Sequence, residues 1–153
     1  MKIPKKGINV PQRIREKLGG EWQIILQAPV GHVFEDRMIG IMRFRIQRGP
    51  ASLCTYVGLP LDHPLAGRKY GDLDIPCHGG LTFSQAGNGR LWPADRWWYG
   101  WDYGHMGDYM TYYDYPPLAG KFTHPTDYKW TPVMVADDAK DALQEFERLV
   151  KNG

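Results

Sequence analysis

The sequence predicts an α+β fold, a small antiparallel sheet with long functional loops and a C-terminal helix packed on one face. Segments in which apolar and polar residues alternate, as in β-strands, recur through residues 21–103, and Gly and Pro residues separate them. Residues 132–151 instead repeat apolar side chains every three or four positions, which is typical of an amphipathic helix. Strands followed by one such helix indicate a sheet with a single covered face.

The elements follow in order along the chain. Pro11 and the Gly19-Gly20 pair predict a short helix over residues 11–18. Residues 29–37 are expected to be a connection, and the Asn88-Gly89 pair predicts a turn between the last two strands. The expected strands are residues 21–28, 38–47, 52–59, 81–85 and 96–103.

The C-terminal helix has the clearest pattern. Thr131 and Pro132 form an N-cap followed by a first-turn proline. One apolar stripe is expected from Val135, Ala139, Ala142, Leu143, Phe146, Leu149 and Val150. With 153 residues, the chain is expected to form a single domain, with residues 1–20 as a loosely attached N-terminal segment.

Composition excludes several classes of protein. With 42% hydrophobic and 24% charged residues, the chain is not expected to be disordered, and it has no apolar run long enough to span a bilayer. It begins without an export signal, so we expect it in the cytoplasm. Cys54 and Cys77 form no CxxC pair, which argues against a zinc ribbon, and both are expected to be reduced and buried. The alternative for Cys77, which directly precedes His78, is a nucleophilic role.

The net charge of +2 conceals a basic N-terminal third and an acidic C-terminal third. Arg43, Arg45 and Arg48 are expected to line the solvated face of one strand, although they could also meet a phosphate or an acidic partner. Nucleic acid is not an expected partner, and neither is a membrane. The sequence assigns no cofactor and no metal.

Aromatic residues are concentrated in one part of the chain. The chain has six Trp, nine Tyr and five Phe, and half of these lie between residues 92 and 115. Trp97, Tyr99 and Trp101 would share one side of a strand, with Trp98 on the other, so some of these rings are expected to face a groove or a partner. The alternative is that they form a Trp-rich core.

Two polar clusters accompany the aromatic residues. Asp102, His105 and Asp108 are spaced three residues apart between glycines, an arrangement that suits a general base, a weak metal site or a loop held by an Asp–His hydrogen bond. His78 precedes Gly79 and Gly80, which allow a close backbone approach. If strands 81–85 and 97–102 pair, His78 should converge with Asp102 and His105.

A third cluster surrounds His63 in the long loop of residues 60–80. His63 is expected to hold this loop in shape, whereas Arg68 could bind an anionic group. The expected ligand-binding residues are Arg68, Tyr70, His78, Gly79, Gly80, Trp97, Trp98, Asp102, His105 and Asp108. If the protein is an enzyme, the expected catalytic residues are His78, Asp102 and His105.

Three runs together resemble a family of small uncharacterised proteins of bacteriophages and bacterial genomes. They are YVGLPLDHPLAGRKYGDLD (56–74), CHGGLTFS (77–84) and WWYGWDYGHMGD (97–108), about a third of the chain. The family pattern has Phe where this chain has Trp101, and a small residue, here Gly104, before the histidine. The resemblance implies a phage accessory protein acting in the bacterial cytoplasm, and it implies no particular reaction.

Three functions remain as hypotheses. The first is binding of a small polar or nucleotide-like molecule in an aromatic, His and Asp pocket, with a host-defence signal as the molecule sequestered. The second is a hydrolase that acts on a nucleotide-like substrate through His78 or His105, with or without a metal. The third is an interaction protein that binds a host protein through an exposed aromatic edge. A homo-oligomer is a further possible assembly.

Overall fold

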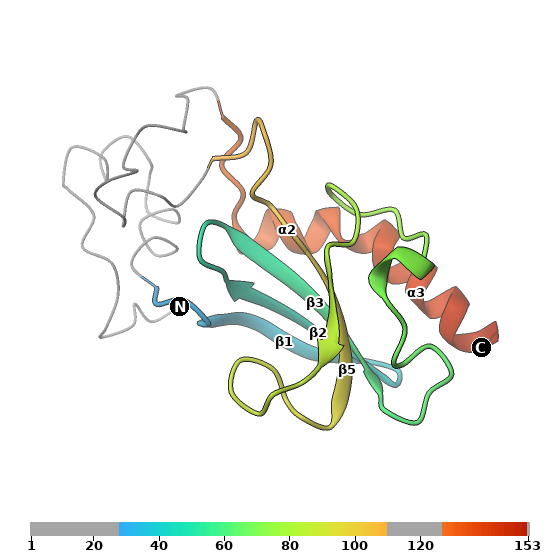
Figure 1. The fold of residues 1–153 in the computed structure, drawn as a ribbon. Helices are drawn as coiled ribbons and strands as arrows, with labels where there is room; N and C mark the ends of the chain where they lie inside the picture. The colour runs from blue at the N-terminus through green and yellow to red at the C-terminus, as the bar shows by residue number, and fades with distance from the viewer. Residues whose placement is uncertain (1–27, 110–126, 153) are drawn as a thin grey trace.

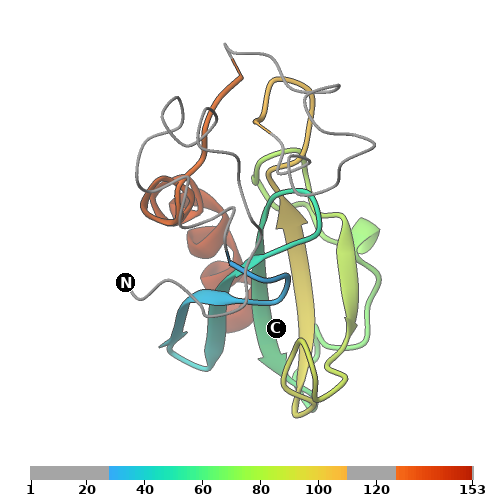
Figure 2. The same cartoon turned by 90° about the vertical axis from the view of Figure 1, so that its left-hand side faces the viewer.

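The computed structural model describes residues 28–109 and 127–152. They form one antiparallel sheet of five strands in the order β1-β2-β3-β5-β4, with two helices on one face (Figures 1 and 2). The strands are β1 (Val33–Ile39), β2 (Met42–Arg48), β3 (Leu53–Pro60), β4 (Phe83–Ala86) and β5 (Arg96–Asp102). The helices are the 3-10 turn η1 (Tyr70–Asp72), α2 (Pro132–Asp138) and α3 (Lys140–Asn152). This arrangement confirms the predicted α+β fold.

The N-terminal hairpin differs from the prediction. The expected connection at residues 29–37 is largely strand β1, and the expected strand at 38–47 is divided by a turn at Gly40, whose φ is 58°. Asp36 of β1 is paired with both Arg43 and Arg45 of β2, at 2.8 and 3.1 Å. These ion pairs keep charged side chains on the outer face of β1 and β2. Because charged residues interrupt the apolar pattern of β1, the sequence did not predict this strand.

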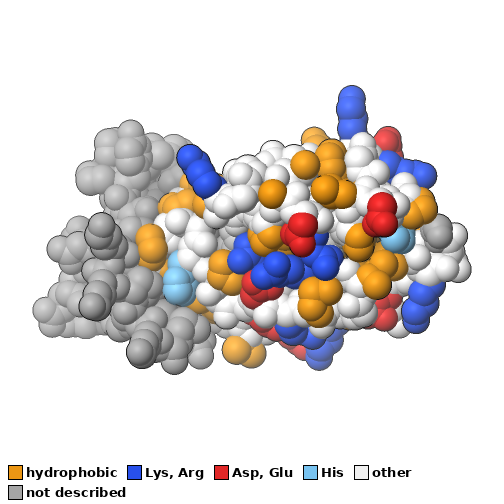
Figure 3. Space-filling view, turned by 90° about the horizontal axis from the view of Figure 1, so that it is seen from below, with side chains coloured by type: hydrophobic (Ala, Val, Ile, Leu, Met, Phe, Trp, Pro, Cys, Tyr) orange, Lys and Arg blue, Asp and Glu red, His pale blue; other side chains and the backbone are white. Residues whose placement is uncertain are grey.

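Arg48 does not lie on the solvated face with Arg43 and Arg45, so this part of the prediction is wrong. Successive side chains of a strand point to opposite faces, so Arg48 has the same orientation as Phe44 and Ile46. It is 1% exposed, and its guanidinium donates to the carbonyl of Gly49. Basic side chains do gather on the surface seen from below, with acidic side chains beside them (Figure 3).

The C-terminal segment forms two helices where one was predicted. The Thr131 hydroxyl accepts the amide N–H of Met134 at 3.3 Å, which confirms the N-cap. The break falls at Ala139, but Ala139 still donates to the Val135 carbonyl, and Leu143 donates to the Ala139 carbonyl. The apolar stripe therefore continues across the break.

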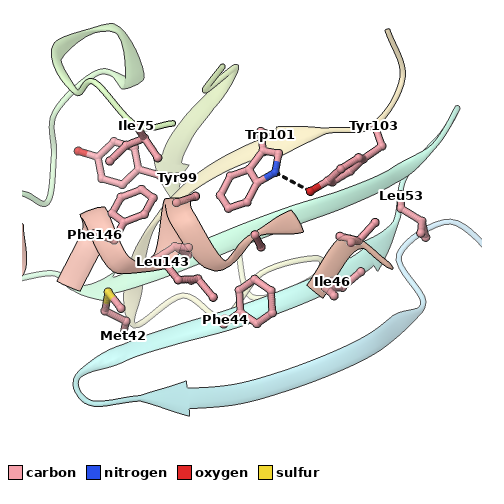
Figure 4. Close-up of a cluster of buried hydrophobic side chains, with 14 of the residues drawn as sticks. Met42, Phe44, Ile46, Leu53, Ile75, Tyr99, Trp101, Tyr103, Leu143 and Phe146 are labelled. Atoms are coloured by element: carbon pink, nitrogen blue, oxygen red, sulfur yellow. Dashed lines mark hydrogen bonds between the residues drawn. The ribbon is translucent and has the colours of Figure 1, made fainter. Parts of the chain in front are cut away.

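The main core lies between the helices and the sheet. Figure 4 shows Phe146 and Leu143 of α3 facing Tyr99 and Trp101 of β5 and Phe44 of β2. The opposite face of the sheet carries a second, smaller cluster of Cys54, Tyr56 and Trp98, with Phe83 and Trp92 packed against it. The loop between β4 and β5, residues 87–95, is longer than the tight turn predicted at Asn88-Gly89, and it brings Trp92 to this cluster.

The predicted helix at 11–18 and strand at 21–28 lie outside the described residues, apart from Ala28. Within the described ranges, neither α2 nor α3 has the length and apolar character needed to cross a lipid bilayer.

Candidate functional site

Three segments far apart in the sequence meet at one end of the sheet. They are the turn before β4 (77–80), the loop after β5 (103–109) and the segment before α2 (127–131), and both ribbon views show the last two at the same end (Figures 1 and 2). The first two meet because β4 and β5 are antiparallel, which places the start of β4 beside the end of β5. The third joins through a bridge in which Tyr128 N–H donates to the Gly107 carbonyl at 2.8 Å.

Asp108 is the centre of this polar cluster. Its side chain is only 5% exposed, and both carboxylate oxygens accept hydrogen bonds. Oδ1 accepts the indole N–H of Trp130 at 2.8 Å, while Oδ2 accepts His78 Nε2 at 2.7 Å and the His105 backbone N–H at 3.0 Å. One buried carboxylate thus joins all three segments.

Asp108 also sets the state of the His78 ring. The indole and the backbone amide can only donate, so each oxygen of Asp108 acts as an acceptor. His78 therefore carries a proton on Nε2, and in the neutral ring Nδ1 keeps a lone pair. No hydrogen bond to Nδ1 is formed within the described residues, and the side chain is 27% exposed.

Aromatic rings hold the His78 imidazole on several sides. Tyr103 stacks on it, with the ring centroids 4.9 Å apart and the planes within 8° of parallel. Trp130 and His105 approach at steep angles, with centroids 5.1 and 5.5 Å away. These contacts fix the plane of the imidazole, and the Asp108 hydrogen bond fixes its rotation.

His105 and Asp102 form a second pair beside His78. His105 Nε2 lies 3.3 Å from Asp102 Oδ1, but it is buried and makes no hydrogen bond. Asp102 Oδ1 instead accepts the Gly104 N–H at 3.0 Å. Gly79, with a φ of 72°, packs directly on the His105 ring, and a Cβ at this position would collide with Nε2. The predicted close approach at Gly79 is therefore present.

Tyr103 connects the cluster to α2. The Trp101 indole donates to the Tyr103 hydroxyl at 3.1 Å (Figure 4), and that hydroxyl donates to Asp138 Oδ2 at 2.8 Å. Burial raises the pKa of Tyr103, so its hydroxyl stays protonated at neutral pH. Asp138 is thereby held beside the segment that carries Trp130.

A surface hollow of about 440 Å³ adjoins the cluster. Its walls come from the segment before α2 and from α2 itself, and they combine aromatic, apolar and acidic side chains: Tyr128, Trp130, Val133, Met134, Asp137 and Asp138. The rings of Tyr128 and Trp130 are 4.6 Å apart at an angle of 63°, so they form an angled wall. Trp130 belongs both to the hollow and to the Asp108 cluster.

The structure brings together six of the ten predicted ligand-binding residues. His78, Gly79, Gly80, Asp102, His105 and Asp108 all lie in the turn before β4 or in the end of β5 and its following loop. Within this group, His78 pairs with Asp108, and Asp102 lies beside His105. The convergence predicted from strand pairing is confirmed.

Trp97 and Trp98 lie elsewhere, and the expectation that they face a groove is wrong for Trp98. Trp98 is fully buried on the opposite face of the sheet, where its indole donates to the Pro93 carbonyl at 3.0 Å. Trp97 is partly buried against the main core. Both are at the start of β5, and Trp97 is roughly 17 Å from Asp102 at the usual rise per strand residue. With Tyr99 and Trp101 also buried, this part of β5 forms core rather than an exposed aromatic edge.

Arg68 and Tyr70 are exposed in the loop between β3 and β4. The Tyr70 amide donates to the Ser84 hydroxyl at 2.9 Å, and among the described residues neither side chain forms a hydrogen bond or ion pair with the cluster. His63 holds this loop as predicted. Its Nδ1 accepts the Leu65 N–H at 3.1 Å, and its Nε2 lies 3.3 Å from the Val150 carbonyl near the end of α3.

The two thiols do not fit a nucleophilic role. Burial raises the pKa of Cys54 to about 11 and that of Cys77 to about 12, so both are protonated at neutral pH. In the described part of the chain, no group of three or more His, Cys, Asp or Glu side chains is arranged to hold a metal ion.

Sequence reasoning missed Tyr103, Trp130 and Asp138 as members of the site. In the sequence, Tyr103 and Trp130 are two aromatic residues among many, and Asp138 is one of several acidic residues of the predicted helix, so no local pattern assigned them to the site. Comparisons with protein-family models, with curated proteins and with solved structures each found no match.

Proposed function

We propose that the protein binds a small polar molecule at the cluster of His78, Asp108 and Trp130 and in the adjoining hollow. One observation carries this proposal: a buried carboxylate uses both oxygens to orient two partly exposed rings. Withdrawing a carboxylate from water costs several kcal/mol unless its hydrogen bonds are complete. Here they are complete, and the result is a fixed imidazole and a fixed indole beside an open hollow.

If the cluster only stabilised the fold, its imidazole and indole rings would be expected to be fully buried. His78 instead keeps part of its ring in contact with solvent, with Nδ1 able to accept a hydrogen bond from a ligand. Trp130 and the half-exposed Tyr128 offer ring surface for stacking. Side chains that are already ordered lose little conformational entropy when a ligand arrives, which favours binding.

The ligand class follows from these groups. A molecule with a flat or apolar part for Trp130 and a donor for His78 Nδ1 would use both, and a nucleotide-like compound is one such molecule. Stacking of a base on an aromatic side chain contributes about 1–3 kcal/mol. The resemblance to phage proteins suggests the setting, the cytoplasm of an infected bacterium, where sequestering a host-defence signal would be the role.

Mass spectrometry of small molecules that co-purify with the full chain from bacterial cells tests this proposal. We expect a compound that is retained by the wild-type protein and lost in His78→Ala and in Trp130→Phe. His32→Ala is the matched control, because this half-buried histidine packs on Phe34 at the start of β1 and should leave binding unchanged. Retention of the compound by both site variants would refute binding at this cluster.

A hydrolase is the second candidate, and the His78–Asp108 pair favours it. A carboxylate that accepts from one imidazole nitrogen holds the other as a general base and stabilises the imidazolium that forms. With both thiols protonated, a water molecule is the nucleophile that His78 would activate. If the co-purified compound is returned chemically unchanged after prolonged incubation with the protein, with and without added divalent metals, the hydrolase hypothesis fails.

A further inference from the structure

The hollow beside the cluster has a composition that selects among small molecules. Among the described residues, its walls carry two aromatic rings, two apolar side chains and two carboxylates, and no basic side chain. Trp130 is held in place by Asp108, and Asp138 by the Tyr103 hydroxyl. The ring surface and one of the two carboxylates are therefore fixed before any ligand binds.

The rings of Tyr128 and Trp130 suit a cation. Their planes are inclined at 63° with centroids 4.6 Å apart, so they form a corner rather than a stack. The face of an aromatic ring attracts a positive charge, and angled aromatic walls are the usual recognition surface for alkylated ammonium groups. Val133 and Met134 complete the wall with apolar groups, which suit the methyl groups of such a cation.

The charges around the hollow favour the same ligand. Within the described part of the chain, the hydrogen bond that Asp138 accepts comes from the Tyr103 hydroxyl, through Oδ2, and Oδ1 accepts none. Asp137 is paired with Lys140 at 2.8 Å, but both side chains are 75% exposed, and such surface pairs are weak and exchange readily. The neighbouring Lys129 amine lies over the Tyr109 ring, 5.0 Å from its centroid. Among the lining residues that the structure describes, a phosphate placed in the hollow would meet two carboxylates and no cation.

We infer that this hollow binds an organic cation, specifically an alkylated ammonium group. The inference rests on the proposed function, since it names the chemical group that the ligand places beside Trp130. Such a group needs no set of directional ligands, unlike a metal ion, and gains from aromatic faces, methyl contacts and a nearby carboxylate together. His78 would then bond the remaining polar part of the same molecule.

An NMR titration of the ¹⁵N-labelled full chain with tetramethylammonium chloride tests the inference. The signal to follow is the indole N–H of Trp130, assigned by its loss in Trp130→Phe, with sodium chloride at equal ionic strength as the salt control. We expect a saturable shift with tetramethylammonium. The neutral analogue tert-butanol and the anionic nucleotide AMP should bind the hollow more weakly.

Two pairs of variants make the test specific. Tyr128→Leu should weaken binding roughly two- to thirty-fold, the range of cation–π contacts, whereas Tyr128→Phe keeps the ring and should bind normally. Asp138→Asn keeps an acceptor for Tyr103 but loses the charge, and should weaken binding roughly two- to five-fold. Asp141→Asn removes an exposed carboxylate that does not line the hollow and should have no effect.

The outcomes distinguish this inference from the proposed function. No saturable shift with tetramethylammonium, or equal binding of tert-butanol, would overturn the cation preference. Binding of AMP at the same indole signal, without binding of the cation, would overturn the cation preference and leave small-molecule binding intact. Loss of the co-purifying compound only in variants outside the cluster would overturn the proposed function itself.

Discussion

Replacing Asp108 by Asn should destabilise the protein markedly, because this carboxylate faces three donors. An Asn side chain places an NH₂ group where one of the two oxygens stood. If the NH₂ group replaces Oδ1, it faces the Trp130 indole N–H, which cannot accept a hydrogen bond. If it replaces Oδ2, His78 can change tautomer and accept from it, but the His105 backbone N–H loses its acceptor.

The orientation with the NH₂ group at the Oδ2 position costs less free energy, so it determines the expected loss of stability. An unpaired buried N–H costs about 1–3 kcal/mol, and the bond that Trp130 keeps becomes weaker once the charge is lost. We expect a loss of about 3 kcal/mol in the free energy of unfolding, which corresponds to a decrease in Tm of roughly 6–12 °C for a chain of this length. Urea denaturation gives the free energy, and calorimetry gives the Tm.

Asp102→Asn is the matched control. Its side chain is 35% exposed, so water can replace a lost partner, and the expected change is below about 1 kcal/mol. In Asp108→Asn, ¹⁵N NMR of the imidazole should also show the His78 proton moved from Nε2 to Nδ1. If Asp108→Asn unfolds like the wild type, or if the two variants lose equal stability, the three-donor arrangement at Asp108 is refuted.

Three further predictions concern the surroundings of the site. Gly79→Ala should lower the stability in thermal unfolding by about 1–2 kcal/mol more than Gly80→Ala does. Both glycines have a positive φ, but only Gly79 packs on His105, and equal losses would contradict this packing. His63→Ala should lower stability by about 1–2 kcal/mol and speed hydrogen exchange near the end of α3, since two contacts of the ring are lost, and unchanged exchange there would argue against the lock. For Cys54, burial raises the folded-state pKa from 9.0 to about 11. Its contribution to the free energy of unfolding is therefore fully present below pH 9 and falls as the pH rises toward 11. Urea denaturation of the wild type and of Cys54→Ala across this pH range measures the difference, and parallel pH profiles of the two proteins would contradict it.

Local patterns predicted most of the sheet because its strands have at least one face in a core. The end of β2 alternates apolar and polar residues, β3 was predicted from its β-branched and aromatic residues, and the pairing of β4 with β5 followed from their order in the chain. β1 was missed because Glu35, Asp36 and Arg37 interrupt its apolar pattern, and the structure compensates them with ion pairs. Such compensation depends on the neighbouring strand, which a local pattern does not contain.

The candidate site was only partly predictable for the same reason. Strand pairing brought His78 and His105 together, but the choice of Asp108 over Asp102 as the partner of His78 depends on the path of the loop after β5. Trp130 joins from a segment 22 residues beyond Asp108, and no periodic pattern reports where that segment returns. For Trp98, a ligand-binding role was predicted where the structure shows burial. Alternation correctly placed Trp98 on the opposite face of β5 from Trp97, but it could not show that Trp92 and the β4–β5 loop cover that face.

The sequence separations around Asp108 also affect when the site forms. Its partners His78 and Trp130 are 30 and 22 residues away, and closing such loops costs entropy that only later contacts repay. The cluster should therefore be completed late in folding, after β4 has paired with β5 and α2 has docked. A ligand that needs His78 and Trp130 together would recognise only the finished native state, and its full binding free energy would count against unfolding.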